Sequence, residues 1–321
     1  MNPTNINSSS DLSAPTGAQR AAGVIIPAVT PLTGNYQLDH EAVEKMFSYF
    51  HEHQVMPFIL GTTGEAPSLP LALKQEYIQL AGKLKRKGDL LYAGISSNCL
   101  GESLALADYC LDAGVDVLVA TLPTYYMLTE REMYHYFEQL AESVRGLLVI
   151  YNIPATTHMS IPLHVVDDLS HHENIVGVKD SERNEERLSK ALQLWSERTD
   201  FSHFLGWAAQ SAEALLKGCD GLIPSTGNFY PGLYRELYEA AKKGNREKAL
   251  EWQQLSDELG DLYQKGRTLG ESLWALKVLM QEAGLCQPYV MPPLLTQNEE
   301  EANKLRRQWQ QINSRESIKL F

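Results

Sequence analysis

The chain has 321 residues, of which 44% are hydrophobic and 21% are charged. These proportions are typical of globular proteins and exclude a wholly disordered, fibrous or membrane-embedded chain. The formal net charge of −12 disfavours a nucleic-acid partner, because proteins that follow a phosphate backbone need clustered Lys and Arg side chains. The length is sufficient for one large α/β barrel or for two ordinary domains.

The cysteines are far apart in the sequence and form no C-x-x-C pair; they are Cys99, Cys110, Cys219 and Cys286. Neither a zinc ribbon nor a disulfide framework is therefore indicated, and a reducing cytoplasm is the expected location. No run of about 18 consecutive apolar residues occurs, so no transmembrane helix is expected. Residues 1–20 are rich in Ser, Asn, Thr and Pro and lack an apolar stretch, which predicts a flexible tail rather than a signal peptide.

From Gly23 onward, short apolar runs alternate with longer stretches of helical periodicity, a pattern typical of βα units around a parallel sheet. Eight strands are predicted, at residues 24–29, 56–60, 91–95, 115–120, 147–151, 175–179, 203–205 and 221–224. Eight such units within about 200 residues favour a (β/α)₈ TIM barrel over an open doubly wound sheet. No G-x-G-x-x-G motif follows the first strand, so a dinucleotide cofactor is not indicated.

Helical periodicity is clear after Asp39, where Val43, Met46, Phe47 and Phe50 recur on one face and Asp39 is a suitable N-cap. A second helix is expected to end at Gly114 and to bury Cys110 in the core.

Beyond residue 231 the strand signals stop, and helical stretches are predicted at 232–263, 271–283 and 297–313. The expected organisation is a flexible tail (1–20), a barrel (21–230) and a C-terminal helical extension (231–321).

Catalytic groups of such barrels lie at the carboxyl ends of the strands, and Lys179 ends the sixth predicted strand. Because side chains alternate along a strand, Ile175, Gly177 and Lys179 are expected to share one face. If that face is the barrel interior, Gly177 leaves room below an amine in an apolar enclosure. Desolvation there lowers the pKa of the ammonium and frees a lone pair for attack on a carbonyl carbon. The alternative is a solvated lysine, which is the usual situation for this residue type.

Tyr151 ends the preceding strand, on the same face as Leu147 and Val149. Neighbouring parallel strands lie about 4.8 Å apart, so the phenol and the Lys179 amine can meet over a shared substrate. A tyrosine there can pass protons to and from a substrate oxygen. The alternative is an ordinary packing role for an amphipathic side chain.

The second strand ends in Gly61-Thr62-Thr63-Gly64-Glu65. Consecutive backbone amides in such a turn suit a carboxylate or a phosphate. The segment lacks the lysine of a P-loop, and a plain loop is the alternative.

With these strand ends, the sequence resembles the dihydrodipicolinate synthase and N-acetylneuraminate lyase family over most of residues 23 to about 290. The resemblance is carried by segments in the order expected for a barrel, namely 61–65 (GTTGE), 122–126 (LPTYY), 151–154 (YNIP), 177–181 (GVKDS) and 220–225 (DGLIPS).

The resemblance implies a class I aldolase or lyase that handles pyruvate together with an aldehyde. In that case Lys179 would form the imine with pyruvate, Tyr151 would be the central acid/base and Thr62 would relay protons to it. Thr63, with the local amides including that of Gly61, would hold the pyruvate carboxylate.

The resemblance also implies that the backbone of Ile223 lines the pocket. A tyrosine matching Tyr126 reaches across a dimer interface in the family, so a homodimer or homotetramer is implied. No external cofactor is implied, because the intermediate is a covalent imine on Lys179. No cluster of His, Asp and Glu with ligand spacing occurs at the strand ends, so no metal is expected.

Departures from the family pattern bear on the second substrate. Thr156 stands where dihydrodipicolinate synthases usually carry an arginine for the carboxylate of the aldehyde, and the loss of a bidentate donor weakens that recognition. His158 replaces a glycine that is usual nearby. Residues 206–210 (GWAAQ) lack the acidic pair typical of sialic acid lyases. The sequences of residues 151–155 (YNIPA) and 178–181 (VKDS) most resemble those of the branch that cleaves 2-keto-3-deoxy sugar acids or 4-hydroxy-2-oxoglutarate.

Three hypotheses follow from the sequence. The first is an aldolase of that branch, and the second is a dihydrodipicolinate synthase with an altered aldehyde site. The third is a catalytically silent barrel that binds keto acids, although a silent relative has no chemical need for Lys179, Tyr151 and Thr62 together.

Overall fold

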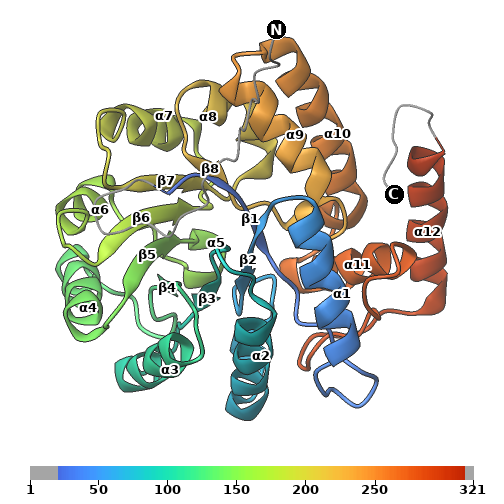
Figure 1. Cartoon of the computed structure of the whole chain (residues 1–321), viewed down its shortest axis with the longest axis horizontal. Coiled ribbons are helices and arrows are strands. Elements are labelled where there is room, and N and C mark those ends of the chain that lie inside the picture. Colours follow the sequence, from blue (N-terminus) through green and yellow to red (C-terminus); the bar gives the residue numbers. More distant parts are fainter. Residues whose placement is uncertain (1–20, 315–321) are drawn as a thin grey trace, which may run out of the picture.

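The computed structural model of the chain describes residues 21–314. In this range eight parallel strands close into a barrel in the order β1-β2-β3-β4-β5-β6-β7-β8, with helices around them (Figure 1), which confirms the predicted (β/α)₈ fold. The expected tail, residues 1–20, and residues 315–321 of the expected extension lie outside the described residues.

The strands are short, and their ends lie within two residues of the predicted ones. They are β1 (Gly23–Pro27), β2 (Met56–Ile59), β3 (Tyr92–Gly94), β4 (Val117–Thr121), β5 (Leu147–Asn152), β6 (Ile175–Asp180), β7 (Ser202–Leu205) and β8 (Gly221–Leu222). The helices are α1 (His40–Glu52), α2 (Leu71–Leu84), α3 (Leu100–Asp112), α4 (Glu130–Ser143), α5 (Pro154–Thr157), α6 (Leu163–Leu169), α7 (Glu185–Leu194), α8 (Ser211–Leu216), α9 (Pro231–Lys242), α10 (Arg246–Gln264), α11 (Leu269–Glu282) and α12 (Glu299–Asn313). Short 3₁₀ turns lie at Ala66–Ser68, Ala208–Gln210 and Ser225–Asn228.

The first helix forms as its sequence predicts. The Asp39 side chain accepts a hydrogen bond from the Ala42 amide at 3.1 Å, which satisfies one of the free N–H groups at the start of α1. Its predicted apolar face is buried against the barrel. Cys110 of α3 is fully buried, as expected, and all four cysteines are free thiols.

The predicted helix at 232–263 is wrong, because two helices, α9 and α10, occupy this stretch. Gly244 takes a left-handed conformation with φ +71° after the end of α9. Asn245 then caps α10, where its side chain accepts a hydrogen bond from the Lys248 amide at 3.1 Å. Glycine is common just after the end of a helix and asparagine is common at an N-cap, so this pair of residues suits the junction between two helices.

Two apolar layers hold the barrel together. The inner layer fills the space enclosed by the strands and includes Phe58, Tyr92, Val149 and Phe204. The outer layer packs the opposite faces of the strands against the helices. This division assigns the apolar strand residues to the inner or the outer face of the barrel, and only side chains on the inner face can reach an interior site.

Strand β6 departs from the alternation expected for it. The pairing of β5 with β6 shifts register between Leu148 and Val149, so that Leu148 pairs with Ile175 and Val149 pairs with Gly177. This irregularity turns Ile175 to the outer layer and leaves Val176 in the inner one. The prediction that Ile175 shares a face with Lys179 is therefore wrong.

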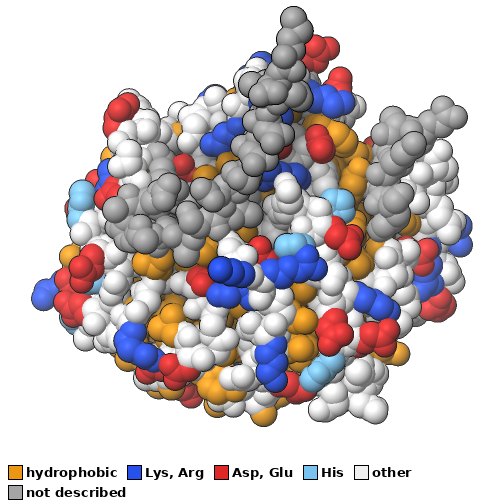
Figure 2. Space-filling view, viewed as in Figure 1, with side chains coloured by type: hydrophobic (Ala, Val, Ile, Leu, Met, Phe, Trp, Pro, Cys, Tyr) orange, Lys and Arg blue, Asp and Glu red, His pale blue; other side chains and the backbone are white. Residues whose placement is uncertain are grey.

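The C-terminal helices form a layer on one side of the barrel. Helix α10 packs against α8, α9 and α11, and α11 packs against α12, which lies at the outer edge in Figure 1. Among residues 21–314, no helix is both long enough and apolar enough to cross a membrane. Figure 2 shows acidic, basic and apolar side chains interspersed over the described part of one face, without a large patch of one sign.

Candidate active site

Tyr151 and Lys179 lie side by side at the carboxyl ends of β5 and β6. Their Cα positions are register partners in the sheet, as the spacing of neighbouring strands predicts. Tyr151 belongs to the inner apolar layer, and the Lys179 side chain also points into the barrel, where its ammonium lies over the Tyr151 ring, 3.8 Å from the centroid.

The Lys179 amine is buried in a mostly aromatic enclosure. The residue is only 3% exposed, and Nζ also lies 5.1 Å from the centroid of the Phe58 ring. Burial lowers the pKa of Lys179 below its ordinary value, although the charge of Tyr151 and a hydrogen bond with it act in the opposite direction. The alternative of a solvated strand-end lysine is thereby excluded, and the amine has the lowered pKa that a nucleophile needs.

The Tyr151 hydroxyl is the centre of a hydrogen-bonded group. It interacts with the side chains of Thr62, Lys179 and Ser181. Burial alone would raise the pKa of the phenol, but the neighbouring Lys179 charge and these hydrogen bonds outweigh burial, so the pKa of Tyr151 lies below its ordinary value. A phenol with a lowered pKa, connected to a second hydroxyl, can accept and return a proton.

Ser181 was not predicted as a site residue. It is half-buried and follows the end of β6, two positions beyond Lys179. Because side chains alternate along an extended chain, a residue two positions after an inward lysine tends to face the same side. That parity is the signal that could have identified it.

The turn after β2 presents free backbone donors beside this group. None of the described residues accepts a hydrogen bond from the amides of Thr62 or Thr63. Thr63 is buried, at 9% exposure, and the Thr62 side chain is half-buried and bonded to Tyr151. Two adjacent N–H groups without a protein acceptor form a small site for a carboxylate next to the buried amine.

Two glycines allow close approaches around the amine. A Cβ added to Gly61 would lie 2.9 Å from the Phe58 ring, which itself borders Lys179. A Cβ added to Gly177 would lie 2.6 Å from the backbone oxygen of Ser202 on β7. Gly177 is therefore required by the approach of the neighbouring strand, and the expectation that it leaves open room below Lys179 is wrong.

An outer network fixes the two strand ends from behind. Asp180 accepts hydrogen bonds from Asn152 at 2.9 Å and from Arg187 Nε at 2.6 Å, and both carboxylate and guanidinium are nearly buried. Arg187 also donates to the backbone oxygen of Ile161 at 2.8 Å, and Asn152 accepts from the Ile161 amide at 3.0 Å. These bonds tie β5, β6 and the intervening loop together, which holds Tyr151 and Lys179 abreast.

The other expected site residues lie around the barrel mouth. Ile223 follows β8 and packs in the inner layer. Thr156 is half-buried in α5, where its hydroxyl donates to the Ile153 oxygen at 3.3 Å, and His158 after it is exposed. Tyr126 is 73% exposed, and its ring packs against that of Tyr125.

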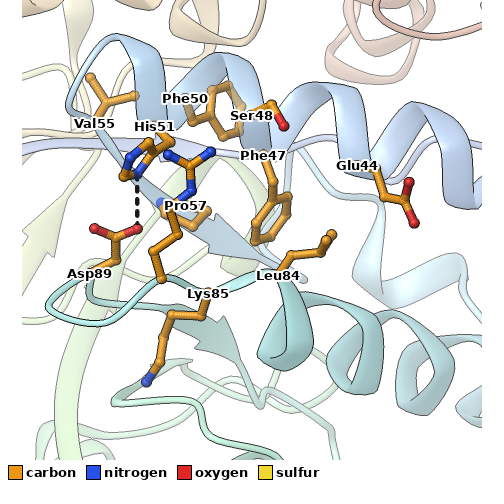
Figure 3. Close-up of a pocket in the computed structure, with 11 residues that line it drawn as sticks. Glu44, Phe47, Ser48, Phe50, His51, Val55, Pro57, Leu84, Lys85 and Asp89 are labelled. Atoms are coloured by element: carbon orange, nitrogen blue, oxygen red, sulfur yellow. Dashed lines mark hydrogen bonds and ion pairs between the residues drawn. The ribbon is translucent and has the colours of Figure 1, made fainter.

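Two cavities are bordered by residues other than those of this group. One of about 130 Å³ is bordered by His51, at the end of α1, and Asp89, before β3, which are 3.2 Å apart (Figure 3). Helix ends and strand starts lie at the amino end of the barrel, opposite Lys179. A larger cavity of about 470 Å³ is bordered by α2, α3, the residues after β3, including Asn98, and the end of β4 at Thr121. Within residues 21–314, no group of three or more His, Cys, Asp or Glu side chains is placed to hold a metal ion.

Comparisons with known proteins agree with the fold. A family model described as the dihydrodipicolinate synthetase family matches residues 20–312. An uncharacterized DapA-like lyase of Pyrococcus horikoshii is 31% identical over 288 residues, covering 88% of this chain and 98% of the relative.

Two solved structures show the same fold. Dihydrodipicolinate synthase from Bacteroides thetaiotaomicron superposes with a TM-score of 0.87 at 27% identity, covering 91% of this chain and 99% of that one. YagE of Escherichia coli K12, a protein of the dihydrodipicolinic acid synthase family in complex with pyruvate, has a TM-score of 0.86 at 25% identity, covering 91% and 98%.

Proposed function

We propose residue roles and a substrate class for this chain, which belongs to the dihydrodipicolinate synthetase family. The family forms a Schiff base between a lysine and pyruvate and needs no external cofactor. The chain is accordingly a lyase of the class I aldolase type. Lys179 is the proposed imine-forming lysine, and the observation that carries this assignment is its buried amine, 3.8 Å above the ring of a tyrosine that is hydrogen-bonded to Thr62.

The proposed reaction begins with the free amine of Lys179. Its nitrogen bonds to the keto carbon of pyruvate, the former keto oxygen takes up protons, and this oxygen leaves as water to give a protonated imine. The imine withdraws electrons from the adjacent methyl carbon, so loss of a methyl proton gives a neutral enamine. In the cleavage direction, the bond between C3 and C4 of a longer keto acid breaks instead, and its electron pair enters the enamine.

Tyr151 moves the protons in this scheme. In cleavage, the phenolate accepts the proton of the C4 hydroxyl as the aldehyde leaves, and in condensation the phenol returns it. Thr62 relays that proton, since its hydroxyl is hydrogen-bonded to Tyr151. The free amides of Thr62 and Thr63, with the Thr63 hydroxyl and Gly61, hold the pyruvate carboxylate, and the backbone of Ile223 closes the opposite side.

The proposed substrate is a 2-keto-3-deoxy sugar acid or a 4-hydroxy-2-oxo acid. Thr156 supports this class, because a short hydroxyl directed to the Ile153 oxygen cannot supply the cation that a carboxylated aldehyde needs. The half-buried hydroxyl of Ser181 beside Tyr151 supports it as well, since it suits a polyhydroxylated chain. The second candidate is condensation of pyruvate with aspartate semialdehyde, favoured by the likeness to dihydrodipicolinate synthase.

Borohydride reduction in the presence of pyruvate tests the central assignment. Reduction should add the mass of a reduced pyruvate imine to Lys179 in the folded wild-type protein, and a Lys179→Ala variant should gain no mass. An unmodified Lys179 would contradict the assignment and favour a silent keto-acid-binding barrel. A panel of keto acids and aldehydes, assayed for pyruvate release or consumption, then separates the two substrate classes.

The exposed loop after β4 supports a homodimer or tetramer. Tyr125, Tyr126 and Met127 are each more than 70% exposed, and the two tyrosine rings pack edge to face at 4.9 Å between centroids. Large apolar side chains that are exposed together typically mark an interface. We infer that Tyr126 of a second copy completes the proton relay at Tyr151.

Mixing two inactive variants tests this inference. In a mixed dimer of Lys179→Ala and Tyr126→Phe chains, one site has an intact lysine and receives an intact Tyr126 from the other chain. If subunits reassort freely, about a quarter of all sites regain activity in an equimolar mixture. A mixture as inactive as its components, with mixed dimers present by native mass spectrometry, would exclude a shared site.

A further inference from the structure

A fully buried ion pair joins the turn after β2 to the C-terminal helices. The Glu65 carboxylate and the Lys277 ammonium are 2.6 Å apart, and neither side chain is exposed to solvent. Glu65 ends the turn that carries Thr62 and Thr63, whereas Lys277 lies in the middle of α11. The pair therefore connects two segments that are far apart in the sequence.

Both charges are also bound to the backbone. The Lys277 ammonium donates hydrogen bonds to the backbone oxygens of Thr30 at 2.8 Å and Tyr289 at 2.6 Å, in addition to its ion pair with Glu65. The second carboxylate oxygen of Glu65 accepts from the Met291 amide at 2.6 Å. The position of the Glu65 side chain is thus fixed by α11 and by the segment that follows it.

A second contact holds the same turn at Gly64, the residue before Glu65. The buried Thr30 hydroxyl donates to the Gly64 oxygen at 2.6 Å, while the Thr30 oxygen accepts from Lys277. Gly64 and Glu65 are consequently both anchored to one ammonium, the first through Thr30 and the second directly.

The backbone of the turn has a conformation that needs such support. Leu60 and Glu65, which flank it, take left-handed conformations with φ +56° and +59°. Residues other than glycine rarely adopt this conformation, and they keep it where surrounding contacts determine the backbone. Strained residues on both sides of Thr62 and Thr63 indicate a turn that is held in one shape.

Stability alone does not account for the pair. Removing two charges from water costs about as much free energy as their attraction returns, and apolar side chains of similar size often serve equally well. The pair instead fixes the position of the turn, because its hydrogen bonds join the turn to the backbone of Thr30, Tyr289 and Met291.

We propose that Glu65 and Lys277 are positioning residues through which the C-terminal helical layer holds the Thr62–Thr63 turn in register with Tyr151 and Lys179. The inference rests on the proposed roles of those four residues. A displacement of reacting groups by 1 Å can cost about a hundredfold in rate, so loosening the turn should impair proton transfer and carboxylate binding while leaving the lysine itself reactive.

The test uses the full-length double variant Glu65→Gln/Lys277→Met, because either single substitution would leave one buried charge uncompensated. Trapping by borohydride with pyruvate should still modify Lys179. Exchange of the pyruvate methyl protons in deuterium oxide, followed by nuclear magnetic resonance, should slow by about tenfold to a hundredfold, and the KM for pyruvate should rise several-fold.

Thr30→Val provides a second variant that keeps both charges and nearly the same volume. It removes only the bond to the Gly64 oxygen, and it should change exchange and KM in the same direction by a smaller factor. The matched control is Lys85→Met/Asp116→Asn, which removes a partly buried pair of 2.7 Å at the opposite end of the barrel. The control should lower the melting temperature and leave exchange and KM unchanged.

Wild-type exchange and KM in the folded double variant would overturn the proposal. If the double variant does not fold, unchanged exchange and KM in Thr30→Val would overturn it instead. Failure of the proposed function can be distinguished from failure of this positioning role. If the proposed function is wrong, the wild-type protein will show neither trapping at Lys179 nor methyl exchange.

Discussion

The hydrogen bond between Thr62 and Tyr151 leads to a quantitative prediction. Thr62→Val removes one of the side-chain partners that lower the pKa of the Tyr151 phenol. A hydrogen bond to a charged group contributes about 1.5–3 kcal/mol, which is the stabilisation of the phenolate that the variant loses. The pKa of Tyr151 should therefore rise toward its ordinary value.

The pH dependence of methyl-proton exchange from pyruvate measures this shift without knowledge of the second substrate. If the phenolate of Tyr151 accepts the proton, the rate rises through the pKa of the phenol. In Thr62→Val that rise in rate should occur at higher pH than in wild type, while the rate at high pH changes less than the rate at neutral pH.

Thr63→Val is the matched control for this experiment, because Thr63 lies in the same turn and has no bond to Tyr151 among its described contacts. It should raise the KM for pyruvate and leave the position of the rise unchanged. An identical pH profile for wild type and Thr62→Val would refute the assignment of Thr62 to the relay.

Three further predictions concern the neighbours of the amine. Tyr151→Phe should slow methyl exchange by about 10²- to 10⁴-fold and lower the pKa of Lys179 further, because Tyr151 raises it; trapping measured by mass spectrometry should then extend to lower pH, and unchanged exchange would argue against Tyr151 as the base. Arg187→Met should lower the free energy of unfolding in urea by about 3–5 kcal/mol, because it leaves a buried carboxylate without its partner; a loss below about 1 kcal/mol, the size expected for the exposed ion pair on α1, would contradict this. Gly61→Ala should cost about 1–3 kcal/mol of stability and slow trapping, since the added Cβ would displace the Phe58 ring, which borders Lys179; an unchanged melting temperature would count against that contact.

The side-by-side placement of Tyr151 and Lys179 could be predicted from the sequence because it depends on regular features. Strand parity and the constant spacing of parallel strands placed the two residues together, and the observed register agrees. Ile175 was misplaced for the same reason, since regular alternation does not include the register shift between it and Gly177. The end of α9 and the start of α10, by contrast, are signalled in the sequence by a glycine and an N-cap asparagine, Gly244 and Asn245. The prediction missed this signal because the helical periodicity continues across it.

The ion pair between Glu65 and Lys277 could not be predicted from local patterns. A lysine within a helix is normally exposed, and nothing in the sequence around Lys277 indicates that three backbone or side-chain oxygens surround it. Contacts between distant segments depend on how the C-terminal layer docks on the barrel. Periodicity does not encode that docking.

The register shift in β6 bears on how a change in the length of this strand would affect the site. Val176 is the extra residue of the irregular pair, because Leu148 faces Ile175 and Val149 faces Gly177. Deleting Val176 would restore regular pairing below Gly177 and leave a void in the inner layer, yet the partners from Val149 to Asn152 would be unchanged. The irregularity thus confines the effect of one extra residue to the amino-terminal half of the strand, so that Lys179 and Tyr151 remain register partners.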